Sequence, residues 1–332
     1  MKTILIKTKG GHEIGMGHAY RSLGLSRELE KDYKIVFYIN DNPQVKALMC
    51  EHSASYFTDG DIEKLESREK IDLLLIDQLS CDDGLPQRLK TRFHNLKVVA
   101  LDFFDYENGF IDVIINLFNQ NLEKPKPDRG DVWYYEGLEY AIIRHEFQTR
   151  ISQKMKTLPR ISKVLVTFGS MDAKDNTGRA IKLLESAGLR EIELDVILGP
   201  LWKGSLPTAP GLDIRDHHSV SASVMADMMA EADIAFCGSG TTVLELLAVG
   251  TPAIIFPQNK WERRFAISIE QKGAIKVIQS DVTQPQDISH ISSLFASFQV
   301  RSEMSQRGKA LVDGKGKERI RNIINPLLGM EN

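Results

Sequence analysis

Short apolar runs alternate with helical patterns along the whole chain. The runs at residues 34–39 and 73–77 predict strands because the first is rich in β-branched and aromatic residues and the second is continuously apolar. Unbroken apolar strands that alternate with helices are typical of a parallel sheet covered on both faces, so the pattern predicts an α/β fold. The other predicted strands are residues 4–6, 98–102, 113–116, 163–168, 194–198, 234–237 and 253–256, and the main predicted helices are 18–31, 43–51, 176–187, 221–231, 241–249, 261–272 and an amphipathic tail at 302–328.

The second half of the chain repeats the strand and helix pattern of the first. A polar, basic segment with little strand signal lies between the halves, around residues 145–161. The pattern therefore predicts an N-terminal Rossmann-like domain at 1–146, a linker at 147–160 and a C-terminal Rossmann-like domain at 161–332. Two similar α/β domains that face each other bind ligands in the cleft between them, and we expect that arrangement here.

Composition narrows the class of protein. The length of 332 residues fits about two domains of ~150 residues. With 42 basic against 45 acidic residues the net charge is −3, so nothing favours nucleic acid or an anionic membrane as a partner. The 3 cysteines have no CxxC spacing, which indicates neither a disulfide framework nor a zinc site. No apolar run reaches the ~18 residues of a membrane span, so we expect a cytoplasmic protein whose oligomeric state stays open.

The first candidate site is the loop after the first predicted strand. Gly15 and Gly17 allow a sharp turn and close approach to a ligand, and they lack the third glycine of a dinucleotide-binding motif, because Tyr20 stands there. His18 follows at the start of a helix, where the positive end of the helix dipole favours the neutral ring that a general base needs. From position alone, a buried structural histidine is equally compatible. Arg21 is expected either to meet an anionic group or to lie on the surface.

Two further glycine loops precede predicted helices in the second half. Small and hydroxyl residues at a helix start can bind a diphosphate through backbone N–H groups. Glu245, one turn into the second of these helices, is placed to bind a ribose, and its alternative is a surface position. The predicted nucleotide-binding residues are Gly169, Ser170, Gly238, Ser239, Gly240, Thr241, Thr242 and Glu245.

Other chemistry finds less support. Asp77 and Asp102 each end an apolar run and are expected to cap loops, with no metal-ligand spacing. The GK[ST] of a Walker loop and the GxSxG of a serine hydrolase are missing, so ATP hydrolysis and serine catalysis are not expected. We expect neither a metal nor a cofactor.

Four ordered motifs resemble the SpsG/PseG family. They are the segment from Ile14 to His18 followed by Arg21, and residues 137–147, 166–172 and 238–250. The resemblance spans nearly the whole chain and implies the GT-B superfamily, related to MurG-type glycosyltransferases. It implies His18 and Asn259 as catalytic residues, Gly15, Gly17, Arg21 and Arg144 as substrate-binding residues, and Glu245 as the residue that holds the nucleotide.

The resemblance implies a hydrolase that releases UDP from a UDP-linked amino or deoxy sugar. Water, activated by His18, would attack and invert the anomeric carbon, as in pseudaminic acid or surface polysaccharide biosynthesis. One alternative is an inverting GT-B glycosyltransferase that uses a UDP-sugar and an acceptor hydroxyl. A second alternative is a non-catalytic protein that binds sugar nucleotides. The residue roles do not separate the first two, because the same base serves both.

Overall fold

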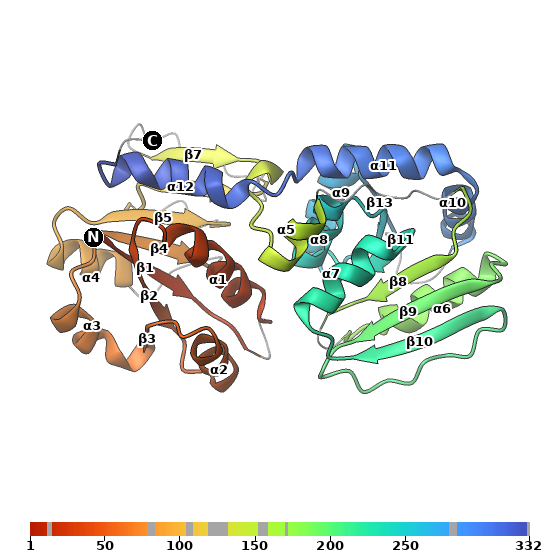
Figure 1. Ribbon diagram of the computed structural model, residues 1–332, viewed down its shortest axis with the longest axis horizontal. Coiled ribbons are helices and arrows are strands. Elements are labelled where there is room, and N and C mark those ends of the chain that lie inside the picture. Colours follow the sequence, from red (N-terminus) through yellow and green to blue (C-terminus); the bar gives the residue numbers. More distant parts are fainter. Residues whose placement is uncertain are drawn as a thin grey trace. The chain divides into compact units, whose positions relative to one another are not determined.

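The computed structural model describes residues 1–11, 15–78, 84–103, 109–118, 132–151, 159–169, 172–278 and 284–330. The chain divides into two compact units (Figure 1). Unit 1 consists of Met1–Arg144 and Lys315–Asn332, and unit 2 consists of His145–Gly314. Each unit has one sheet whose strands all pair in parallel, so the predicted α/β architecture with two Rossmann-like domains is confirmed.

Unit 1 has a sheet of seven strands in the order β3-β2-β1-β4-β5-β6-β7. The order reverses between β1 and β4, which pair directly, with Thr8 opposite Asp77. The strands are β1 (Thr3–Thr8), β2 (Lys34–Ile39), β3 (Tyr56–Thr58), β4 (Leu73–Asp77), β5 (Lys97–Leu101), β6 (Val113–Asn116) and β7 (Trp133–Glu136), and the helices are α1 (Gly17–Leu29), α2 (Pro43–Glu51), η1 (Asp59–Asp61), α3 (Ile62–Arg68), α4 (Leu85–Arg92), η2 (Leu138–Tyr140) and α12 (Gly316–Leu327).

Unit 2 has a sheet of six strands in the order β10-β9-β8-β11-β12-β13. Here the order reverses between β8 and β11, which also pair directly. The strands are β8 (Lys163–Thr167), β9 (Ile192–Leu198), β10 (Leu212–His218), β11 (Ile234–Cys237), β12 (Ala253–Ile255) and β13 (Ile275–Val277), and the helices are α5 (His145–Ile151), α6 (Asn176–Ser186), α7 (Ala222–Glu231), α8 (Thr241–Val249), α9 (Lys260–Glu270), α10 (Pro285–Ala296) and α11 (Phe298–Leu311).

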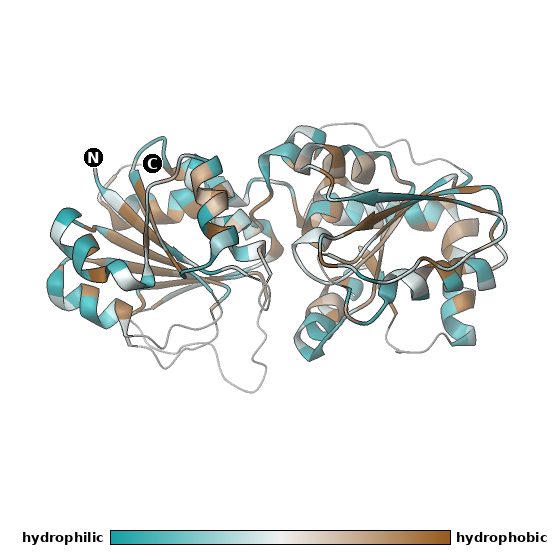
Figure 2. Cartoon of the chain, turned by 90° about the horizontal axis from the view of Figure 1, so that it is seen from below, coloured by the Kyte–Doolittle hydropathy of each residue, from teal (hydrophilic) through white to brown (hydrophobic). Residues whose placement is uncertain are grey.

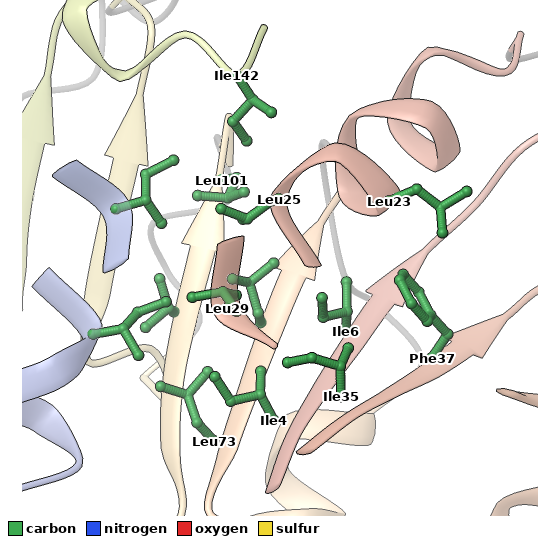
Figure 3. Packing of buried hydrophobic residues seen from close by; sticks show 14 of the residues in the cluster. Ile4, Ile6, Leu23, Leu25, Leu29, Ile35, Phe37, Leu73, Leu101 and Ile142 are labelled. Atoms are coloured by element: carbon green, nitrogen blue, oxygen red, sulfur yellow. The ribbon is translucent and has the colours of Figure 1, made fainter. Parts of the chain in front are cut away.

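Both faces of the unit 1 sheet are buried, which explains the unbroken apolar runs. Successive strand residues point to opposite faces, so Ile4 and Ile6 pack on one face and Leu5 on the other. Figure 3 shows two residues of α1 in the first of these clusters, Leu25 beside Leu101 and Leu29 nearer to Ile4 and Ile6. Hydrophobic residues concentrate in the strands of both units, whereas the helices carry polar residues as well (Figure 2).

The tail helix α12 belongs to unit 1, so the predicted C-terminal domain of 161–332 is wrong at its end. Ile320 and Ile324 of α12 lie in the same core cluster as α1. The Tyr33 hydroxyl donates to Asn325 Oδ1 at 2.8 Å, and Arg321 Nη1 lies 2.8 Å from Glu28 Oε1. The apolar stripe of the tail predicted a helix correctly, but a stripe does not specify which sheet it covers.

The predicted linker at 147–160 begins inside a helix. Helix α5 belongs to unit 2, where Phe147 is buried and Arg150 Nε donates to Asp227 Oδ1 of α7 at 2.7 Å. Residues 152–158 lie outside the described residues. The structure therefore places the boundary between Arg144 and His145.

Candidate functional site

The switch point of the unit 1 sheet carries the first predicted loop. In open α/β sheets, ligands bind at the carboxyl ends of the strands where the strand order reverses. The loop after β1 runs into α1, with Gly15 at φ +74° and Gly17 as the first helical residue. A Cβ atom at Gly15 would meet open space, so its backbone is accessible. Ile14 lies outside the described residues.

His18 lies in the first turn of α1 and is paired with a carboxylate. Its Nδ1 is 2.8 Å from Oδ1 of Asp77, the last residue of β4. Asp77 can only accept, so a hydrogen bond to it requires a proton on Nδ1, which leaves Nε2 of a neutral ring as an acceptor. Arg21 Nη2 also lies 3.2 Å from Nδ1, so the guanidinium is next to the ring. The imidazole is 24% exposed, so it is partly accessible to solvent.

Asp77 is the buried centre of a group of polar side chains, which we call the His18 cluster: His18, Arg21, Ser22, Asp77 and Asp102. Asp77 is completely buried and accepts hydrogen bonds from Arg21 through Nε at 3.2 Å and through Nη2, and from Ser22 Oγ at 2.7 Å. Burial by itself raises the pKa of Asp77, but the Arg21 charge and the hydrogen bonds from His18 and Arg21 outweigh it. The pKa of Asp77 is therefore held well below its usual range.

Arg21 connects the two carboxylates of the cluster. It is 9% exposed, and its Nη1 donates to Oδ2 of Asp102. Burial by itself lowers the pKa of Arg21, but the charges of Asp77 and Asp102 raise it by more than burial lowers it. The net shift of the pKa is upward, so the guanidinium stays charged. The surface alternative for Arg21 is therefore wrong, and its predicted contact with the substrate stays a prediction.

The structure overturns the predicted role of Asp77 and adds a contact to the predicted role of Asp102. Asp77 was expected to cap a loop, but its side chain is buried and binds His18. Asp102 does cap a loop, since its Oδ1 accepts from Leu117 N at 3.0 Å, and it also binds Arg21. The pairing of Asp77 with His18 had one signal in the sequence. Asp77 ends an apolar run, and the rules for βαβ connections could have placed that strand beside β1.

Arg144, another predicted substrate-binding residue, lies at the end of unit 1. Its guanidinium carbon is 5.8 Å from the ring centroid of Tyr20, two residues after His18. This stacking places Arg144 beside the first turns of α1, and a contact with the substrate stays a prediction.

The switch point of unit 2 carries residues 238–242, which we call the α8 loop. Helix α8 begins at Thr241 with Gly240 as its N-cap and no capping side chain. Ser239 is buried and its hydroxyl donates to Glu262 O at 3.0 Å, while a Cβ atom at Gly240 would meet open space. The α8 loop thus combines an uncapped helix start with accessible backbone, which suits an anionic ligand.

Glu245 lies in α8 and is 3% exposed, so the surface alternative for it is wrong. Cys237 at the end of β11 is also buried. Burial raises the pKa of the Cys237 thiol, and the charges of Glu245 and Glu262 add to this effect. The carboxylate of Glu245 therefore lies inside unit 2 near the α8 loop, and the predicted contact with a ribose stays a prediction.

The other glycine loop of unit 2 has a different helix start. Gly169 has φ +78°, and Ser170 lies outside the described residues. Asp172 accepts from the backbone N–H groups of Asn176 and Thr177, each at 2.8 Å, and Asp175 accepts from Gly178 N at 3.2 Å. The carboxylates of Asp172 and Asp175 therefore already accept hydrogen bonds from the first N–H groups of α6, which a diphosphate would need.

Asn259, the second predicted catalytic residue, is the N-cap of α9. Its Oδ1 accepts from Trp261 N at 3.0 Å and Glu262 N at 2.9 Å, and its Nδ2 donates to Glu262 Oε1 at 3.0 Å. These contacts give Asn259 a structural role, and its catalytic role stays a prediction.

The described residues contain neither a metal-binding cluster nor a membrane-spanning helix. Within the described ranges, no group of three or more His, Cys, Asp or Glu side chains is arranged to hold a metal ion. None of the helices in the same ranges is both long and apolar enough to cross a bilayer.

A domain family matches part of this chain, and a known protein sequence matches nearly all of it. Residues 163–318 match the Glycosyltransferase family 28 C-terminal domain. The chain is 24% identical to Spore coat polysaccharide biosynthesis protein SpsG of Bacillus subtilis over 338 aligned positions, covering 97% of each chain. These matches support the resemblance to the SpsG family that the four motifs indicated.

Solved structures share the fold. MurG of Acinetobacter baumannii superimposes with a TM-score of 0.68 at 15% identity, covering 98% of this chain and 100% of that one. MnaA of S. aureus, solved with UDP, superimposes with a TM-score of 0.63 at 14% identity, covering 100% of this chain and 98% of that one. The GT-B fold is therefore confirmed over the whole length of the chain.

Proposed function

We propose that this protein is an inverting glycosyltransferase that takes the sugar from a UDP-sugar and transfers it to an acceptor hydroxyl. The observation that carries the proposal is the match of residues 163–318, which include the α8 loop and Glu245, to a glycosyltransferase domain. This match favours the transferase over the hydrolase that the sequence resemblance implied. The likeness to a spore coat polysaccharide biosynthesis protein supports polysaccharide biosynthesis as the context of the reaction.

In the proposed mechanism, His18 is the general base. Nε2 removes the proton from the acceptor hydroxyl while its oxygen attacks the anomeric carbon and the bond to the UDP oxygen breaks. Asp77 holds the ring in the required tautomer, and its carboxylate stabilises the imidazolium that forms. The proton thus moves from acceptor to His18, and the electron pair of the broken bond leaves with UDP.

The α8 loop binds the nucleotide in this proposal. The uncapped N-terminus of α8 presents backbone N–H groups and the positive end of the helix dipole to the diphosphate. These groups stabilise the negative charge that grows on UDP as the bond breaks. MnaA, which shares the fold, was solved with UDP, which agrees with a uridine nucleotide as the ligand.

The test is to measure UDP release from a panel of UDP-sugars in ¹⁸O-labelled water, with and without a panel of mono- and oligosaccharide acceptors. A transferase releases UDP rapidly only when an acceptor is present, and its product carries no ¹⁸O. Full-rate release without acceptor, with ¹⁸O at the anomeric carbon of the free sugar, assigns the hydrolase. Binding of UDP without turnover in either arm assigns the non-catalytic binding protein.

A further inference from the structure

The His18 cluster has an unbalanced charge. It contains one guanidinium, of Arg21, and two carboxylates, of Asp77 and Asp102, in direct contact. With a neutral imidazole, the cluster carries one net negative charge, and proton uptake by His18 makes it neutral. Charges that are largely removed from water interact more strongly than exposed ones, so this balance affects the proton affinity of the ring.

Asp102 is held in place at both of its oxygens. Oδ1 accepts from Leu117 N at 3.0 Å, and Oδ2 accepts from Arg21. The residue has φ +49°, in the left-handed region that aspartate tolerates, and its backbone N donates to Ile115 O at 3.0 Å. This turn after β5 directs the carboxylate toward Arg21.

The Arg21–Asp102 pair is largely shielded from solvent. The side chain of Asp102 is 15% exposed. A small pocket of about 10 Å³, partly open to solvent, borders the pair and is lined also by Tyr140, Ile142 and Ile320. That volume has room for about one water molecule, so protein atoms make up most of the environment. Removing the charge of Asp102 would therefore be felt by its neighbours with little screening.

We propose that Asp102 is a positioning residue for proton transfer to His18, because it neutralises Arg21 and leaves the negative charge of Asp77 available to the imidazolium. Without Asp102, Asp77 is the only carboxylate of the cluster that neutralises Arg21. Proton uptake by His18 then gives the cluster a net positive charge. Within the described part of the chain, Asp102 bonds to Arg21 and not to His18, so it acts on the ring through Arg21. The inference concerns the proton affinity of His18, and its effect on turnover rests on the proposed function.

The test compares Asp102→Asn, Arg21→Gln and the double variant with the parent protein. The asparagine side chain keeps an oxygen for Leu117 N but removes the charge, and the double variant returns the cluster to one net negative charge. Asp112→Asn is the matched control, because Asp112 also accepts from a backbone N–H, of Val98 at 2.7 Å, and pairs with a cation, Lys90, at 3.0 Å, outside the cluster.

The first readout is the pH midpoint of the His18 imidazole resonances in NMR, which needs no activity. We expect the midpoint to fall by about 1 pH unit in Asp102→Asn, to rise in Arg21→Gln, and to lie between these two values in the double variant. If the single variant Asp102→Asn does not fold, the remaining proteins still test the proposal. The midpoint of Arg21→Gln should then lie above the midpoints of both the double variant and the parent. An unchanged midpoint in Asp102→Asn, or a double variant as low as the single one, would overturn it.

The second readout is turnover. With Asp102→Asn, kcat should fall about 10-fold with KM for the UDP-sugar within about twofold, and the double variant should recover most of the loss. Asp112→Asn should change neither readout. If the parent releases no UDP under any condition while the midpoints shift as expected, the proposed function fails and the coupling of Asp102 to His18 stands. Unequal midpoints with equal kcat in all variants would contradict the role in proton transfer.

Discussion

The two switch points of the molecule have the same topology and different chemistry. In unit 1, the strand order reverses between β1 and β4, and the carboxyl ends of the strands hold a cluster of charged side chains around Asp77. In unit 2, the order reverses between β8 and β11, and the loop after β11 offers small residues and an uncapped helix start. A charged cluster can accept a proton and an open helix N-terminus can bind an anion, so the same fold supports a separate role at each point.

A second contrast lies within unit 2. Both α6 and α8 follow glycine-containing loops at the same switch point. Helix α6 is capped by the carboxylates of Asp172 and Asp175, whereas α8 has Gly240 and no side-chain cap. Of these two helix starts, the one at α8 is therefore the better anion site, and substitutions in each unit test both contrasts.

The largest expected effect is on turnover in unit 1. Changing His18→Ala should lower kcat by ~10²–10⁴-fold, the usual contribution of a general base. The Kd for UDP should change less than twofold, or about 0.4 kcal/mol, because the nucleotide binds the α8 loop. Steady-state kinetics and calorimetry measure the two quantities. His94→Ala is a control, since His94 is an exposed histidine of the same unit.

Next in size is the stability of the His18 cluster. Asp77→Asn should lower the free energy of unfolding by about 3–5 kcal/mol, because it removes one partner of a buried ion pair. Asp112→Asn, at a more exposed pair, should cost about 1 kcal/mol or less. Chemical denaturation of both variants measures the difference, and equal losses would contradict a special role for Asp77.

The stability lost in Asp77→Asn should depend on pH. Because the folded-state pKa of Asp77 is depressed, its charge stabilises the fold fully above the unfolded value of about 4, and this contribution is lost as the pH falls toward the folded value. The difference in stability between parent and Asp77→Asn should therefore narrow in acid. A difference that stays constant below about pH 4 would show that the charge is not its source.

A smaller effect is expected on nucleotide binding in unit 2. Glu245→Ala should weaken UDP binding by about 5- to 150-fold, the loss of roughly 1–3 kcal/mol of hydrogen bonding to a ribose. The fold should stay intact by circular dichroism. Glu231→Ala is the control, since the side chain of Glu231 is 63% exposed. Unchanged UDP affinity in Glu245→Ala would make Glu245 a structural residue of α8.

The smallest effect concerns α6. Asp172→Ala should cost ~1 kcal/mol of stability, as expected for a lost helix cap, and leave UDP affinity unchanged. The next residue, Ala173, has no side-chain oxygen that could take over the cap. Thermal denaturation and calorimetry measure the two quantities. A loss of UDP affinity comparable to that of Glu245→Ala would place the nucleotide at the Gly169 loop instead.

Most of the fold could be predicted from the sequence because buried parallel strands are continuously apolar. The prediction missed the strands β3, β7, β10 and β13. Of these, β10 is an edge strand in which the exposed Asp213 and Arg215 alternate with the partly buried Leu212 and Ile214. It also assigned α12 to the wrong unit. An amphipathic stripe shows that a helix packs on a sheet, but it does not specify which sheet. These errors arise where long-range packing decides the outcome.

The site was predictable in part. His18 and residues 238–242 follow strands in short local motifs, so the sequence located them. Asp77 lies 59 positions from His18, and the pairing depends on β4 lying beside β1, which no local pattern states. The capping of α6 by Asp172 likewise follows from a left-handed turn at φ +47°, a conformation that composition does not reveal.

In the proposed function, unit 1 carries proton transfer and unit 2 carries nucleotide binding. The most direct measurement is a calorimetric titration of UDP into His18→Ala and Glu245→Ala, with kcat measured on the same samples. We expect parent-like UDP affinity and lost turnover in His18→Ala, and weakened UDP affinity in Glu245→Ala. If His18→Ala loses UDP binding as strongly as Glu245→Ala, the division of roles is contradicted, and His18 contributes to binding or to the fold instead.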